Sequence, residues 1–160
     1  MSILKRLMNT GKAIVLIGAR QTGKTTLLKE LSKEGKNIQW LDADDITVRN
    51  LISNLTINKL PSLFGNCDMI VVDEAQRVEN IGLQMKLITD NLPNVQLLIT
   101  GSSAFELSNR INEPLTGRKW EYHLFPFSFT ELQQHFGTLE EIRNLPLRLV
   151  YGCYPDVVNN

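Results

Sequence analysis

The chain lacks net charge, is poor in cysteine and contains no long hydrophobic run. Its 17 Lys and Arg residues balance 17 Asp and Glu residues, so composition does not support nucleic acid or a membrane surface as a partner. Two cysteines, Cys67 and Cys153, are too few for a disulfide framework and lack metal-ligand spacing. The longest apolar runs have about five residues, whereas a membrane span needs roughly 20. We therefore expect a cytoplasmic protein without a membrane span.

The rest of the composition, with 42% hydrophobic and 21% charged residues, is typical of a globular domain, and we expect one domain over residues 1–160. Short apolar segments alternate with helical ones along the chain. The predicted strands are 13–17, 37–41, 68–72, 95–99 and 119–124, and the predicted helices include 3–9, 24–34, 80–91, 128–136 and 139–146. This α/β alternation predicts a mainly parallel five-stranded sheet with helices on both faces and a ligand at the carboxyl ends of its strands.

The segment 18–25 matches the phosphate-binding pattern G-x-x-x-x-G-K-[ST] and lies between a predicted strand and a predicted helix. In such a loop, backbone N–H groups face phosphate oxygens, Lys24 reaches the β- and γ-phosphates, and the Thr25 hydroxyl ligates Mg²⁺. A chance turn before an ordinary helix would not explain this context. The residues predicted to bind nucleotide are Gly18, Ala19, Arg20, Gln21, Thr22, Gly23, Lys24, Thr25 and Thr26.

Two carboxylates end the predicted strand 68–72. Asp73 is placed to hold Mg²⁺, through water, and Glu74 to polarise an attacking water as a general base. The alternative is an acidic cap after a strand, but the upstream phosphate-binding pattern favours the chemical interpretation. Gln76 and Arg77 follow directly, and they either couple the nucleotide state to a partner or simply begin a helix.

Two further positions are candidates for contact with the γ-phosphate. Thr100 ends the predicted strand 95–99 and is expected to sense that phosphate or the attacking water, with Ser102 behind it. Ser102 or Ser103 is alternatively the cap of a following helix. Arg118 precedes the last predicted strand and is expected to neutralise γ-phosphate charge in its own subunit or a neighbour's. The alternative for Arg118 is a solvated or carboxylate-paired side chain.

The same motifs discriminate between classes of nucleotide-binding protein. A GTPase needs Asn-Lys-x-Asp, and the nearest run, 58–61, has no Asp, so ATP is the expected nucleotide. A small-molecule kinase needs an acceptor site and a basic lid, which Arg110 and Arg118 match weakly. The carboxylate pair favours attack by water and therefore an ATPase, a hydrolase acting on Mg-ATP. A nucleotide-dependent binding switch with little intrinsic hydrolysis remains the alternative.

The motifs at 18–27, 71–77, 98–103, 115–118, 125–132 and 152–158 occur in an order that resembles a known family. The chain is similar to the N-terminal AAA-type ATPase domain of a large group of prokaryotic ATPases. The resemblance implies a three-layer P-loop NTPase fold of the ASCE/AAA type. In that fold the fourth strand lies between the strand before the phosphate-binding segment and the strand that bears Asp73. Cys153 stands where the family more often has a second glycine.

The resemblance also implies partners. Proteins of this family usually continue into a C-terminal restriction-endonuclease-like domain of unknown function. We therefore expect residues 1–160 to be an N-terminal fragment whose ATP hydrolysis changes the conformation of that C-terminal domain or of a protein partner. A homo-oligomer is compatible with Arg118 acting on a neighbour. A role with DNA is suggested only by analogy with the C-terminal domain.

Overall fold

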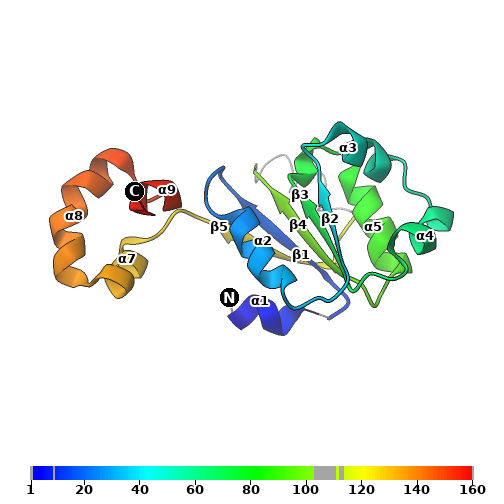
Figure 1. Ribbon diagram of the computed structural model, residues 1–160, viewed down its shortest axis with the longest axis horizontal. Helices are drawn as coiled ribbons and strands as arrows, with labels where there is room; N and C mark the ends of the chain where they lie inside the picture. The colour runs from blue at the N-terminus through cyan, green and yellow to red at the C-terminus, as the bar shows by residue number, and fades with distance from the viewer. Residues whose placement is uncertain (1, 9, 103–110, 112–113, 160) are drawn as a thin grey trace.

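The protein folds as a five-stranded sheet covered by helices on both faces, with a helical arm beyond the last strand (Figure 1). The computed structural model describes residues 2–8, 10–102, 111 and 114–159. The strands are β1 (Ala13–Gly18), β2 (Ile38–Asp42), β3 (Met69–Asp73), β4 (Gln96–Gly101) and β5 (Lys119–Leu124). The helices are α1 (Ser2–Leu7), α2 (Lys24–Ser32), α3 (Ile46–Ser53), α4 (Leu60–Phe64), α5 (Ile81–Asn91), α7 (Phe129–Phe136), α8 (Thr138–Tyr151) and α9 (Pro155–Asn159). Two 3₁₀ turns are η1 (Ile57–Lys59) and η2 (Ala75–Arg77).

The strand order is β2-β3-β4-β1-β5, and every neighbouring pair is parallel. The predicted position of β4 between β1 and β3 is therefore confirmed. Because the strands are parallel, the residues that end β1, β3 and β4 lie along one edge of the sheet. This topology brings together segments that are far apart in the sequence.

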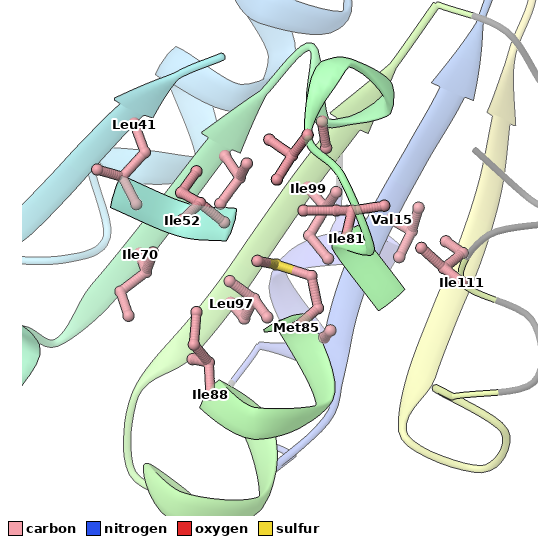
Figure 2. Packing of buried hydrophobic residues seen from close by; sticks show 14 of the residues in the cluster. Val15, Leu41, Ile52, Ile70, Ile81, Met85, Ile88, Leu97, Ile99 and Ile111 are labelled. Carbon is pink, nitrogen blue, oxygen red and sulfur yellow. The ribbon is translucent and has the colours of Figure 1, made fainter. Parts of the chain in front are cut away.

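One face of the sheet packs on α3, α4 and α5. Alternate strand residues point toward this layer, because side chains of a strand alternate between its two faces. Figure 2 shows the α5 residues Ile81, Met85 and Ile88 packed with Leu97 and Ile99 of β4. These side chains are buried, and each such burial stabilises the fold by about 1.5–3 kcal/mol.

The opposite face is covered by α1 and α2. Ile14 and Leu16 of β1 point toward this layer and pack with Leu28 and Leu31 of α2. Neighbouring residues of β1, Val15 among them, belong to the other layer, so the strand is buried on both faces. This double burial explains why β1 is a continuous apolar run rather than an alternating one. The three-layer α/β fold expected from the sequence is confirmed.

Helices α7, α8 and α9 form the arm, which lies to one side of the sheet in Figure 1. Ser128 and Glu131 form a capping box at the start of α7. Within α8, Arg148 donates two hydrogen bonds to the buried carboxylate of Glu141, at 3.0 and 3.2 Å, and this contact holds the pKa of Glu141 below its ordinary value. The arm is thus ordered by its own capping and ion-pair contacts.

Several helix ends differ from the predicted bounds. Helix α8 was expected at 139–146 but continues to Tyr151, with Pro146 inside it, and ends where Gly152 takes a φ of +82°. The helix continues past Pro146, although a proline removes one backbone donor and crowds the preceding turn, and it stops at the glycine, whose positive φ ends it. Conversely, α1 ends at Leu7 and α2 at Ser32, before the predicted limits. Among the described helices, none combines the length and apolar character that a membrane crossing requires.

Candidate functional site

The segment 18–25 joins the end of β1 to the start of α2, and we call it the phosphate loop. A Cβ atom on Gly18 would lie 2.3 Å from the carbonyl oxygen of Leu124, the last residue of β5. Gly23 has a φ of +91°, and Gln21 has a φ of +64°. The loop therefore needs glycine at 18 for lack of space and at 23 for its backbone conformation. This path leaves Ala19, Arg20 and Gln21 exposed to solvent.

We expect alanine substitutions at the two glycines to lower the free energy of unfolding for different reasons. Gly18→Ala places a methyl group against rigid backbone, so we expect a loss of about 1–3 kcal/mol in the free energy of unfolding, together with weaker nucleotide binding. Gly23→Ala meets no atom within 4 Å. There we expect only the left-handed backbone cost of about 1–2 kcal/mol. Denaturant unfolding measures both free energies. A Gly18→Ala variant as stable as the wild type would show that β5 does not hold the loop.

Lys24 is the first residue of α2 and is only 4% exposed. Its ammonium donates a hydrogen bond to the carbonyl oxygen of Ala19 at 2.7 Å, so the side chain curls back into the phosphate loop. Burial lowers the pKa of Lys24, while the carboxylates of Glu74 and Asp73 act in the opposite direction. The buried cation thus lies in the loop, and the charges of Asp73, the last residue of β3, and of Glu74, the next residue, favour its protonated form.

Asp73 connects the loop to the neighbouring strands. It is 6% exposed, and its Oδ2 accepts a hydrogen bond from the Thr25 hydroxyl at 2.9 Å. Its Oδ1 accepts from the hydroxyl of Thr100, a fully buried residue of β4. The backbone N–H of Glu74 contacts both Asp73 Oδ1 and Thr100 Oγ1 at 3.2 Å. Three residues singled out in the sequence are therefore in direct contact, from α2, β3 and β4.

The oxygen atoms of this cluster suit a hard cation. Mg²⁺ prefers oxygen ligands and is usually held by one or two carboxylates together with substrate phosphates and water. The Thr25 hydroxyl and the Asp73 carboxylate supply such a set, and they already touch one another. Across the described residues, no three His, Cys, Asp or Glu side chains are grouped to hold a metal by themselves. The donors thus fit a Mg²⁺ ion that is shared with a phosphate ligand.

Glu74 takes a left-handed backbone conformation, with a φ of +52°, directly after β3. Its Oε2 accepts a hydrogen bond from Gln76 Nε2 at 2.5 Å. The same amide nitrogen donates to Ser102 Oγ at 2.7 Å. The sequence did not indicate that Gln76 would bridge Glu74 and Ser102, because Ser102 lies 26 residues further along the chain. Its neighbour Arg77 pairs with Asp44, at 2.5 Å between Nε and Oδ1.

Arg118 does not lie with the other predicted residues. Its carbonyl oxygen accepts from the backbone N–H of Ala13, the first residue of β1, whereas the phosphate loop begins at Gly18, the last residue of that strand. Its side chain pairs with Asp90 of α5, at 2.6 Å between Nε and Oδ1. Because parallel β1 and β5 both begin at this far edge, Arg118 lies at the opposite edge of the sheet from its own phosphate loop, and its side chain is paired with a carboxylate. Arg110 and Ser103 lie outside the described residues.

Comparison with known sequences identifies proteins that are similar to this chain. A family model described as an AAA domain matches residues 10–133. Two curated mycobacterial proteins are 27% identical over 116 residues, uncharacterized protein Mb2031c of Mycobacterium bovis (strain ATCC BAA-935 / AF2122/97) and uncharacterized protein Rv2008c of Mycobacterium tuberculosis (strain ATCC 25618 / H37Rv). The match covers 72% of this chain but only 25% of each relative, so the chain spans about a quarter of their length.

Solved structures show the same fold at low sequence identity. The Walker-type ATPase PABY2304 of Pyrococcus abyssi is 19% identical, with a TM-score of 0.61 over 91% of this chain and 60% of that one. A DNA replication initiation factor is 18% identical, with a TM-score of 0.55 over 94% of this chain and 59% of that one. The FIGL-1 AAA domain in complex with ADP is 15% identical, with a TM-score of 0.51 over 78% and 46%. These likenesses support the P-loop NTPase fold.

Proposed function

Since the chain belongs to the AAA domain family, we propose that it binds ATP with Mg²⁺ and hydrolyses the β–γ phosphoanhydride bond to ADP and phosphate. One observation carries the proposal: Lys24, Thr25, Asp73 and Thr100 meet at the phosphate loop. These side chains are polar, and three of them are buried, although burying polar groups costs free energy unless they are paired. A site for a charged ligand explains why they gather at one edge of the sheet.

Each of these residues has a proposed role in binding. The backbone N–H groups of the loop and the Lys24 ammonium bind oxygens of the β- and γ-phosphates. Thr25 and Asp73 hold Mg²⁺, which when bound neutralises phosphate charge. Thr100 contacts the γ-phosphate, and its present bond to Asp73 places its hydroxyl beside the proposed metal ligands. Arg20 and Gln21 line the exposed side of the loop.

Glu74 is the proposed general base. It follows Asp73 directly, and its negative charge opposes the lowering of the Lys24 pKa by burial. Water attacks the γ-phosphate while Glu74 orients it and accepts its proton. This assignment also separates an ATPase from a small-molecule kinase, in which an acceptor hydroxyl would take the place of the water.

The arm gives a route from the loop to a C-terminal domain or a protein partner. The Leu124 carbonyl, at the end of β5, lies against Gly18, and the chain then runs through residues 125–128 into α7. Any shift of the phosphate loop therefore pushes on β5 and on the arm attached to it. We propose that ATP hydrolysis is coupled through this contact to the domain or partner beyond the arm. We also propose a cytoplasmic location, because the proposed reaction requires both ATP and Mg²⁺.

Arg118 is proposed to complete the site of a neighbouring copy. Arg118 lies at the far edge of the sheet, out of reach of its own phosphate loop. Its side chain is half exposed beside Asp90. We expect Arg118→Ala to lower turnover by about 10²-fold or more, since such arginines stabilise transition-state charge. Mixing Arg118→Ala with Glu74→Gln should restore turnover, because one subunit supplies the base and the other the arginine. A mixture no more active than its separate components would exclude this role.

Phosphate release from Mg-ATP, measured over a wide range of protein concentration, tests the proposed function. We expect free phosphate as the product and a turnover per subunit that rises with concentration. A phosphorylated acceptor would instead identify a kinase. Tight ATP binding without release would support the alternative of a nucleotide-dependent switch.

A further inference from the structure

We infer that Gln76 is a positioning residue for Glu74, anchored by Ser102, and that the rate of ATP hydrolysis depends on this three-residue chain. The inference rests on the proposed function, because it assumes that Glu74 is the base. It adds a residue from the turn η2 and one that directly follows β4 to a site otherwise formed by α2, β3 and β4. The contacts that carry it are the bonds of the Gln76 amide to Glu74 and to Ser102.

The orientation of the Gln76 amide follows from its partners. Its Oε1 lies 3.3 Å from the backbone nitrogen of Ser102, and a backbone N–H can only donate. The acceptor side of the amide must therefore face Ser102. Nε2 is then left to face Glu74 Oε2, where it donates to the carboxylate at 2.5 Å. The Ser102 hydroxyl is a second anchor, at 2.7 Å from Nε2.

The turn that carries Gln76 is held at both ends. At its start, the backbone N–H of Arg77 donates to the carbonyl oxygen of Glu74 at 3.1 Å, and Ala75 is buried in the core. At its end, the Arg77 side chain pairs with Asp44 beyond β2. The contacts of Gln76 with Ser102 therefore tie Glu74 to the segment that directly follows β4. A carboxylate on a flexible side chain gains catalytic value from such a fixed position.

The geometry also assigns different tasks to the two carboxylate oxygens. Gln76 takes Oε2, which leaves Oε1 of Glu74 as the oxygen to accept a proton from water. Ser102 comes two residues after Thr100, the proposed γ-phosphate contact. A movement of the end of β4 when Thr100 engages phosphate would therefore reach Glu74 through Ser102 and Gln76. In this way the base responds to the same strand that senses the nucleotide.

Single-turnover phosphate release and Mg-ATP affinity, measured on Gln76 variants of the chain, test the inference. We expect Gln76→Ala to lower the rate by about 10- to 100-fold with affinity unchanged, because a small displacement of a reacting group is costly but no phosphate contact is lost. Gln76→Glu keeps the shape of the side chain but replaces the donor by a carboxylate, and it should be at least as slow. Gln84→Ala is the matched control, since Gln84 is another half-buried glutamine, bonded to the Ser53 carbonyl away from this site. Its rate should equal that of the wild type.

A double variant separates positioning from a merely structural role. If Gln76 acts only through Glu74, then Glu74→Gln and the double variant Glu74→Gln with Gln76→Ala release phosphate at the same rate. A further loss in the double variant, or a wild-type rate for Gln76→Glu, would overturn the inference while leaving the ATPase proposal intact. A Glu74→Gln variant as fast as the wild type would overturn the inference together with the assignment of Glu74 as the base, while ATP hydrolysis itself would stand. Unchanged affinity for Mg-ATP shows in each case that the variant is folded.

Discussion

Glu74→Gln is expected to reduce phosphate release from Mg-ATP by about 10²- to 10⁴-fold while nucleotide binding is retained, because general bases contribute factors of this size. The substitution removes the group that accepts a proton but keeps the length and shape of the side chain. Its amide oxygen can still accept the hydrogen bond that Gln76 donates to Glu74. The loss should therefore fall on the chemical step alone. Steady-state phosphate release and the affinity of a fluorescent ATP analogue measure the two quantities separately.

Glu79→Gln is the matched control for this experiment. Glu79 is an exposed carboxylate shortly after η2, and the same change of charge there should leave turnover and binding unaltered. If Glu74→Gln releases phosphate as fast as Glu79→Gln, Glu74 is not the base and another group must activate the water. If Glu74→Gln loses nucleotide affinity as well as turnover, its carboxylate supports the loop rather than the reaction.

Lys24→Ala is expected to weaken Mg-ATP binding by about 100-fold, because it removes charge-assisted hydrogen bonds to phosphate oxygens. The ammonium lies at the start of α2 and is bonded to the loop carbonyl of Ala19. No side chain of the variant can replace this charge inside the loop. Equilibrium titration with a fluorescent ATP analogue measures the dissociation constant. Mg-ATP affinity equal to that of the wild type would show that the phosphates bind elsewhere.

The stability of the Lys24→Ala variant should not fall with its affinity. Burial lowers the pKa of Lys24 below 10.5. A folded-state pKa below the unfolded-state value means that the buried ammonium opposes folding at neutral pH, and that this cost disappears as the pH rises toward the unfolded value. Removing the charge removes that cost, so thermal unfolding near neutral pH should show no large loss. Lys29→Ala, on the exposed side of the same helix, controls for the loss of a lysine and should change neither property.

The local motifs could be identified from the sequence because their signals lie close together along the chain. The phosphate loop needs glycines, a lysine and a threonine at fixed spacing between a strand and a helix, and the structure has that order from β1 to α2. Strand β3 is a short apolar run ended by two carboxylates, and β5 was predicted with its observed bounds, 119–124. The order of the strands did not follow from spacing. It came from a resemblance between ordered motifs, and the parallel pairing of β4 with β1 and β3 confirms it.

The contacts between distant segments were decided by the tertiary structure. Nothing in the sequence indicates that the Leu124 carbonyl lies against Gly18, since a backbone atom has no residue-specific signal. The same holds for the anchoring of Gln76 on Ser102, because a glutamine in a turn has many possible partners. The opposite-edge position of Arg118 required the register of β5 against β1. By itself the sequence determined which chemical groups are present and the local conformations that carry them, because these depend on neighbouring residues. Only the fold decided which of those groups meet, because that depends on how strands from distant parts of the chain pair in one sheet.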